Sequence, residues 1–220
     1  MRQYLLRHGQ SVSNREGRVQ GQLDVPLSVI GESQADATAW RLVECRETMG
    51  IEEIWSSPLA RARGTAERVA GALGLPVHFD DRLKELHAGI FQGRLWKDLD
   101  QLFPDEMARW RAGDHAYAIP EGESRLQLAM RGRDVLHELS TRPVQGLLVV
   151  AHGGVLTAAI RLLVDVKGHQ SLEGGQLPPM ANTALSLLEW PGPSLVSFND
   201  VSHLHPEIVT EQRQERLAEL

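Results

Sequence analysis

The sequence predicts an α/β fold, a three-layer sandwich with a mainly parallel central sheet, helices on both faces and a small helical lobe over the candidate site. Three observations support this prediction. Short apolar runs recur along the 220-residue chain, helix-like patterns separate them, and two of the runs end in histidine followed by glycine. Because parallel strands need helical crossovers of one hand, this alternation indicates a single sheet covered by helices.

Two of the predicted strands are short apolar runs that stop at a polar residue. The first run stops at Arg7 and His8, so its carboxyl end presents both side chains. The most apolar run stops at His152. In chain order, strands are predicted over residues 4–6, 51–56, 76–79, 146–151, 184–190 and 195–198.

Each predicted helix has apolar residues at helical spacing, and proline or glycine marks several of the ends. Pro58 opens one helix, because the first helical turn tolerates proline, and Gly74 ends it. A loop at residues 119–122 separates the two helices of the lobe, and the polar tail after Pro206 favours a short helix or a frayed end. In chain order, helices are predicted over residues 29–48, 58–73, 96–112, 124–140 and 155–164.

The chain is predicted to form one domain over residues 1–220, with about residues 92–141 inserted as a helical lobe over the sheet edge. Its composition, 42% hydrophobic and 24% charged, is that of an ordinary globular protein, and its length is enough to bury a sizeable core. Cys45 is the only cysteine, which excludes an intrachain disulfide and a cysteine metal cluster.

The net charge of −6 disfavours a non-specific nucleic-acid binder, and we expect no nucleic-acid partner. This charge still allows an anionic small-molecule substrate, because a few local arginines outweigh a mild global field. The apolar run at the N-terminus is too short for a signal peptide, and no run reaches transmembrane length. We therefore expect a soluble cytoplasmic protein without a membrane partner, and a homodimer remains open.

Two histidines, His8 and His152, directly follow predicted core strands. Ligands of open α/β sheets bind beyond the carboxyl ends of the strands, so the imidazoles converge there if the two strands are parallel neighbours. Gly9 and Gly153 permit close backbone approach, and the N–H groups that open the following helix favour an anion. Either histidine alone is more often a structural residue, whereas the matched pair favours a ligand site.

Arginines accompany both histidines. Arg7 at the end of a buried strand needs an anionic partner, because an unpaired buried charge is costly. Arg61 lies one turn into the second predicted helix, but spacing alone does not choose between it and Arg63, and either is compatible with a surface charge. Guanidinium groups bind phosphate oxygens in pairs, so this set suits a phosphoryl group. Taken alone, Glu85 and His87 have the character of ordinary loop residues.

Five segments in the same order resemble the histidine phosphatase superfamily, which has the phosphoglycerate-mutase-like fold. The third segment aligns the second phosphate-binding arginine of that family with Arg61. The segments are Arg7-His8-Gly9-Gln10-Ser11 with Asn14, Gln20-Gly21-Gln22-Leu23-Asp24 with Pro26-Leu27-Ser28, Ser56-Ser57-Pro58-Leu59-Ala60-Arg61-Ala62, Leu83-Lys84-Glu85 before Gly89 and Gly93, and Val149-Val150-Ala151-His152-Gly153-Gly154.

The resemblance implies a phosphoryl-transfer enzyme that works without a metal or other cofactor. His8 is then the nucleophile that becomes phosphorylated. Glu85 is the general acid that protonates the leaving oxygen and afterwards the base that activates water. The positions expected to hold the phosphoryl oxygens or to lie near the substrate are Arg7, Arg61, His152, Asn14, Gln20, Gly21 and Gly153.

Physical chemistry agrees with these implied roles. Histidine attacks only through an unprotonated ring nitrogen, and its ordinary pKa of about 6.5 makes that form accessible near neutral pH. Phosphoryl transfer depends on in-line placement and charge stabilisation, which two arginines and a protonated His152 supply. A positioned carboxylic acid adds a rate factor of about 100 to 10,000.

Within the family the choice lies between hydrolysis and mutase transfer. Mutases of this family carry a longer lid with extra basic residues after the acid/base segment. Here residues 91–123 contain Arg94, Lys97, Arg109 and Arg111 but no adjacent arginine pair. This favours the broad-specificity phosphatase branch and the hydrolysis of small phosphomonoesters, with a phosphoglycerate mutase as the alternative.

Two further classes remain as weaker alternatives. A non-catalytic phosphate-binding module on the same scaffold is disfavoured because all the proposed chemical residues are present. A metal hydrolase is disfavoured because the chain has no His-Glu-x-x-His pattern. The natural substrate is open, because Leu23, His87, Phe91 and Trp96 are compatible with either a pocket wall or plain core packing.

Overall fold

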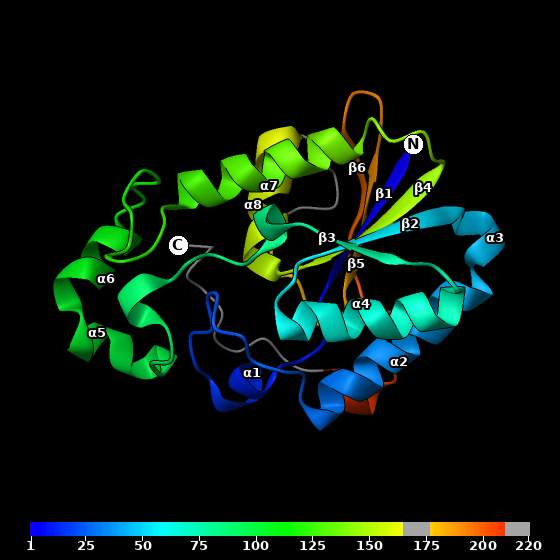
Figure 1. Ribbon diagram of the computed structural model, residues 1–220. Coiled ribbons are helices and arrows are strands. Elements are labelled where there is room, and N and C mark those ends of the chain that lie inside the picture. The colour runs from blue at the N-terminus through cyan, green and yellow to red at the C-terminus, as the bar shows by residue number, and fades with distance from the viewer. Residues whose placement is uncertain (165–176, 210–220) are drawn as a thin grey trace.

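The computed structural model describes residues 1–164 and 177–209. Within these ranges one six-stranded sheet runs through the molecule in the order β3-β2-β4-β1-β5-β6 (Figure 1). The first four strands are mutually parallel, and β5 is antiparallel to both of its neighbours. The strands are β1 (Arg2–Arg7), β2 (Ile51–Ser56), β3 (Val77–Phe79), β4 (Gly146–Ala151), β5 (Leu185–Glu189) and β6 (Ser194–Asp200).

Helices cover both faces of this sheet, which confirms the predicted three-layer α/β architecture. Helices α7 (Arg125–Leu139) and α8 (Gly153–Leu163) pack together on one face, and α2 (Val29–Glu44) and α4 (Ala60–Leu73) pack together on the other (Figure 1). The shorter elements are α1 (Val12–Glu16), α3 (Arg46–Met49), α5 (Leu99–Leu102), α6 (Pro104–Arg111) and the 3-10 turns η1 (Asp81–Leu83), η2 (Gly89–Phe91), η3 (Trp96–Asp98) and η6 (Pro206–Ile208).

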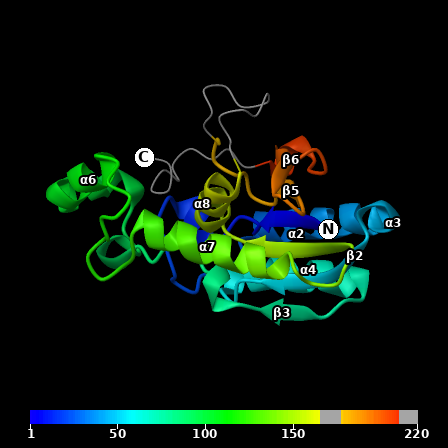
Figure 2. The ribbon, with the colours of Figure 1, turned by 90° about the horizontal axis from the view of Figure 1, so that it is seen from above.

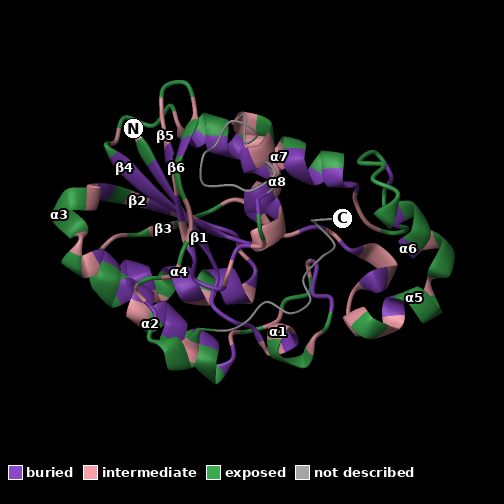
Figure 3. Ribbon diagram, turned by 180° about the vertical axis from the view of Figure 1, so that it is seen from behind, coloured by how far each residue is buried: buried purple, intermediate pink, exposed green. Residues whose placement is uncertain are grey.

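The two central strands, β1 and β4, are buried on both faces of the sheet, which explains their nearly continuous apolar sequences (Figure 3). Leu5 and Val149 join the apolar core beneath α7 and α8, whereas Leu6 and Val150 join the core beneath α2 and α4. Side chains on successive strand residues point to opposite faces, so this alternation fixes the register. The carboxyl ends of β1 and β4 are therefore held side by side.

Helix α4 begins later than predicted. It starts at Ala60 rather than at Pro58, because Leu59 is the N-cap and has an extended backbone. The amide of Ala60 donates to the Asp24 carboxylate at 2.5 Å, so a loop distant in sequence caps this helix. Its end at Gly74, in the left-handed region with φ of 70°, agrees with the prediction.

The single helix predicted over residues 96–112 is wrong, because Pro104 divides it. Proline lacks an N–H and disfavours helical backbone in the preceding residue, and Phe103 indeed leaves the helical region, with φ of −141°. The stretch consists instead of η3, α5 and α6. The helix predicted over residues 29–48 is likewise divided, because α2 ends at Cys45.

The stretch predicted as a lobe, about residues 92–141, contains η3, α5, α6 and α7. Helix α7 packs on α8 at Gly132, where an added Cβ would lie 2.9 Å from Val155, so α7 belongs to the outer layer of the sandwich. The lobe that extends beyond the layers contains α5 and α6, at the opposite end of the molecule from α3 (Figure 2).

Residues 206–208 form the predicted short helical turn, and the tail from residue 210 lies outside the described residues. None of the helices described in residues 1–164 and 177–209 is long and apolar enough to cross a membrane.

Candidate active site

The structure brings the two strand-end histidines together. β1 and β4 pair in parallel up to Arg7 and Ala151, and the amide of His8 continues the pairing by donating to the Ala151 carbonyl at 3.0 Å. The imidazoles of His8 and His152 lie edge to face, with ring centroids 5.0 Å apart. Convergence at the carboxyl edge of the sheet therefore follows directly from the register of β1 and β4.

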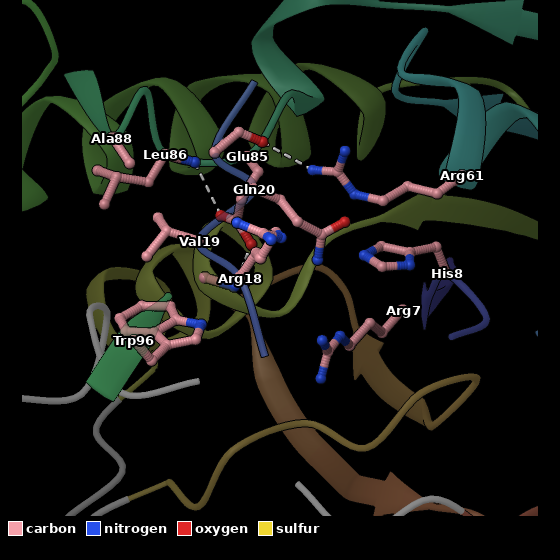
Figure 4. Close-up of a pocket in the computed structure, with 12 residues that line it drawn as sticks. Arg7, His8, Arg18, Val19, Gln20, Arg61, Glu85, Leu86, Ala88 and Trp96 are labelled. Carbon is pink, nitrogen blue, oxygen red and sulfur yellow. Dashed lines mark hydrogen bonds between the residues drawn. The ribbon is translucent and has the colours of Figure 1, made fainter. Parts of the chain in front are cut away.

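A cleft opens beside His8 at this edge of the sheet (Figure 4). The space beside His8, with the adjoining open solvent included, is about 520 Å³. Its lining combines charged groups at the sheet edge with an apolar wall further out. The lining residues are Arg7, His8, Arg18, Val19, Gln20, Gly21, Arg61, Glu85, Leu86, Ala88, Trp96 and Gly154.

The surroundings of the His8 ring favour its neutral form. Its Nδ1 lies 2.6 Å from the Gly9 carbonyl oxygen, which only accepts, so Nδ1 carries the proton and Nε2 keeps its lone pair. Burial, followed by the positive charges of Arg61 and Arg7, lowers the pKa of His8 well below its ordinary value. The attacking form of the imidazole is therefore the favoured one.

Two buried guanidinium groups flank His8. Arg61 donates to the carbonyls of Leu23 at 2.9 Å and Gly21 at 2.7 Å, and Arg7 donates to the carbonyl of Met180. Both arginine side chains are almost completely buried, with 1% and 2% exposure, whereas Arg63 is exposed. The structure therefore places Arg61, and not Arg63, in the site.

The Glu85 carboxylate lies at the N-terminus of α8 and faces the cleft (Figure 4). It accepts hydrogen bonds from the amides of Gly154 at 2.9 Å, Val155 at 3.1 Å and Leu86 at 2.8 Å. These three N–H donors fix the position of the Glu85 carboxyl group at the start of α8. An added Cβ at Gly154 would lie 2.4 Å from the carboxylate, so only glycine allows this approach.

His152 is fully buried behind His8, and its Nε2 lies 2.8 Å from the Ser57 hydroxyl. Burial, then the charge of Arg61, lowers the pKa of His152 well below its ordinary value. A neutral His152 is therefore favoured over the protonated one that was expected, because burial and then the neighbouring guanidinium groups disfavour a further cation. Its Nδ1 has no hydrogen-bond partner among the described residues, a condition typical of functional sites.

Three of the four residues expected near the substrate contribute to the cleft or its supports, and Asn14 is one step removed. Gln20 and Gly21 line the cleft, and Gly153 packs against Arg7, where an added Cβ would meet the arginine side chain at 3.4 Å. Asn14 lies outside the lining that the described residues form, because its side-chain oxygen accepts from the Ser11 amide in the capping box of α1. Gln20 is tied to the same cap, because its oxygen lies 2.6 Å from the Ser11 hydroxyl.

The sequence interpretation missed several contributors. Ser57 and Gly154 appeared only as parts of motifs, and their contacts with His152 and Glu85 join residues about 70 to 95 positions apart. Trp96 lines the cleft, whereas Phe91 is fully buried in the core. Leu23 and His87 lie outside the lining formed by the described residues. The other missed lining residues are Arg18, Val19, Leu86 and Ala88.

A sheet edge with two imidazoles between buried guanidinium groups is suited to binding and transferring a phosphoryl group. Residues 3–201 match the family described as the histidine phosphatase superfamily, branch 1. The chain therefore belongs to the histidine phosphatase superfamily.

Particular relatives include both phosphatases and a mutase. The chain is 36% identical to "Probable phosphoglycerate mutase GpmB" of Yersinia enterocolitica over 171 aligned residues, and the aligned region covers 76% of each chain. A solved mycobacterial glucosyl-3-phosphoglycerate phosphatase in complex with VO3 is 33% identical, with a TM-score of 0.75 and coverage of 90% of this chain and 98% of that one. The alpha-ribazole phosphatase from Shigella flexneri is 28% identical, with a TM-score of 0.75 and coverage of 91% and 96%.

Proposed function

We propose that this protein hydrolyses small phosphomonoesters through a phosphohistidine intermediate on His8. The observation that carries the proposal is the tautomer of His8, whose Nδ1 is held by the Gly9 carbonyl and whose Nε2 keeps its lone pair beside two buried guanidinium groups. Electrostatic preorganisation of this kind stabilises the charge on a transferring phosphoryl group.

In the first step, the guanidinium groups of Arg7 and Arg61, which line the cleft, hold the phosphoryl oxygens, and His8 Nε2 forms a bond to phosphorus. His152 lies outside that lining and supports the ring of His8 from behind. The bond between phosphorus and the alcohol oxygen breaks, and the protonated carboxyl of Glu85 gives its proton to that oxygen. In the second step the Glu85 carboxylate takes a proton from water, whose oxygen attacks phosphorus. The P–N bond then breaks, releasing inorganic phosphate and neutral His8.

A mutase is the second candidate, because of the 36% identity with a protein of that name. The arrangement of the basic side chains in and near the lobe disfavours a mutase. Arg111 pairs with Asp100, and the guanidinium of Arg109 lies 4.1 Å from the centre of the Tyr117 ring. Arg94 and Lys97 are also absent from the cleft lining that the described residues form. Apart from Arg7 and Arg61, the lining formed by the described residues contains one cationic side chain, Arg18. It therefore offers no cluster of basic side chains that would bind the second phosphate of a bisphosphorylated intermediate.

The test is phosphate release from p-nitrophenyl phosphate and from alkyl phosphomonoesters, together with trapping of the intermediate. We expect an acid-labile, alkali-stable phosphoryl adduct in the wild type. Replacing His8 by alanine should abolish the adduct and lower kcat about 1,000-fold or more. Replacement of the exposed His115 is the matched control. Fast transfer between phosphoglycerates in the presence of bisphosphoglycerate, with negligible release of phosphate, would establish the mutase instead.

A further inference from the structure

Arg131, on α7, holds the segment that carries Glu85 from outside the cleft. Its Nη1 donates to the carbonyl of Arg82 at 2.7 Å and also to the carbonyl of Lys84. Its Nη2 donates to the carbonyl of Glu85 itself at 2.9 Å. One guanidinium therefore binds three backbone carbonyls within four consecutive residues. Arg131 does not appear in the cleft lining that the described residues form, so it has no direct route to a bound substrate.

Glu123 completes this arrangement. Its carboxylate forms a two-point ion pair with Arg131, at 2.6 Å to Nη2 and 3.0 Å to Nε. The same carboxylate accepts from the amide of His87 at 2.8 Å. The two side chains are mostly buried, with 20% and 15% exposure, so solvent screens this pair less than the surface pairs. The pair thus fixes the backbone on both sides of Glu85.

The segment needs such supports because it has little regular structure of its own. Residues 84–88 lie between η1 and η2 and belong to no strand or helix of the described chain, so side-chain donors such as Arg131 and Gln22 bind the backbone carbonyls of this stretch. Only a planar guanidinium offers several donors in a fixed fork, so lysine is a poor substitute. The position of the Glu85 carboxyl relative to the leaving oxygen matters, because a 1 Å displacement can cost about 100-fold in rate.

We propose that Arg131 and Glu123 are positioning residues for the general acid, a role that rests on the proposed function of Glu85. The pair acts by fixing the Glu85 backbone, so that its carboxyl meets the leaving oxygen. The expected signature is selective. Substrates whose alcohol is a poor leaving group need the proton and should suffer from loss of the pair. Substrates whose leaving group is a stable anion need no proton, so loss of the pair should leave their turnover unchanged.

The experiment measures kcat/KM for a series of phosphomonoesters whose leaving-group pKa ranges from that of dinitrophenol to that of an alkyl alcohol. This quantity reports the phosphorylation step and excludes the later attack by water. For Arg131→Leu we expect a loss of about 10- to 100-fold with alkyl phosphates and of about 3-fold or less with dinitrophenyl phosphate, within the range of general acid catalysis. Arg131→Lys and Glu123→Gln should show the same trend at smaller amplitude, and they keep the test available if Arg131→Leu does not fold.

Two controls separate the possible outcomes. Arg133→Leu removes a partly exposed arginine from the same helix, which pairs with Asp134 and not with the Glu85 segment, and should change neither substrate class. Glu85→Gln should steepen the dependence on leaving-group pKa at least as much as Arg131→Leu. In one outcome, Glu85→Gln steepens the dependence of kcat/KM on leaving-group pKa, whereas the Arg131 and Glu123 variants lower kcat/KM equally for all substrates or leave it unchanged. That outcome overturns the positioning role, and the proposed function stands. If Glu85→Gln shows no such dependence, the acid role of Glu85 fails, and the role of the pair fails with it.

Discussion

Replacing Gly154 by alanine directly tests how Glu85 is held. The new Cβ would lie 2.4 Å from one oxygen of the carboxylate and 3.0 Å from its carbon. Ordinary contact begins at 3.4 Å, so the carboxylate must withdraw by about 1 Å, a displacement that can cost about 100-fold in rate. We therefore expect kcat/KM for an alkyl phosphate to fall about 100-fold, equivalent to about 2.7 kcal/mol of transition-state stabilisation.

The assay compares kcat/KM for an alkyl phosphate and for dinitrophenyl phosphate in the same variant, with the melting temperature as a check on folding. The matched control is Gly71→Ala, an exposed helical glycine whose added Cβ would contact nothing within 4 Å. This control should keep full activity and gain about 0.5 to 1 kcal/mol of stability. A folded Gly154→Ala variant with wild-type kcat/KM for the alkyl substrate would refute the placement of the Glu85 carboxyl at the start of α8.

Three further predictions concern the imidazoles and the cleft wall. Burial and neighbouring cations lower the folded-state pKa of both His8 and His152, so the unfolded chain binds protons more readily below about pH 6.5. The free energy of unfolding should therefore fall as the pH drops below that value, by up to about 1.4 kcal/mol per pH unit for each histidine. Chemical denaturation of His152→Gln should show a shallower dependence of the free energy of unfolding on pH. Replacing Ser57 by alanine removes the partner of His152 Nε2 and should lower kcat/KM about 10-fold; unchanged activity in a folded variant would show that the contact is not needed. Replacing Trp96 by alanine should raise KM about 10-fold for naphthyl phosphate and leave KM for glycerol phosphate unchanged, and equal effects on both would contradict a direct contact with the leaving group.

The sequence was most informative where one strong local signal decides the structure. The run over residues 146–151 matches β4, because a parallel strand buried on both faces of a covered sheet reads as a short continuous apolar run. The stretch over residues 51–56 matches β2, although two glutamates interrupt its apolar residues and only part of it is buried. The meeting of His8 and His152 was predictable for a related reason, because parallel neighbours end at the same edge. Pro104 was an available signal as well, and the predicted helix over residues 96–112 gave its effect too little weight.

The supports of the site were not predictable, because each joins segments far apart in the chain. Nothing local to Ser57 indicates that its hydroxyl meets His152, and nothing local to Gly154 indicates that its missing Cβ makes room for Glu85. Asn14 differs from these residues, because its side-chain oxygen makes a short-range cap with the Ser11 amide, a common role for asparagine near a helix start. The substrate contact that the resemblance implies for Asn14 stays a prediction.

The charge arrangement of the cleft explains why the supports are so numerous. Two guanidinium groups and two imidazoles are buried together, and burial followed by the like charges of the guanidinium groups lowers the pKa of both imidazoles. A buried cation also needs hydrogen-bond acceptors, which the carbonyls of Leu23, Gly21 and Met180 provide. These carbonyls fix where the guanidinium donors point without cancelling their charge. The folded protein thus keeps a positive hollow on a rigid apolar sheet, and a phosphoryl dianion is the kind of group whose binding offsets the cost of that charge.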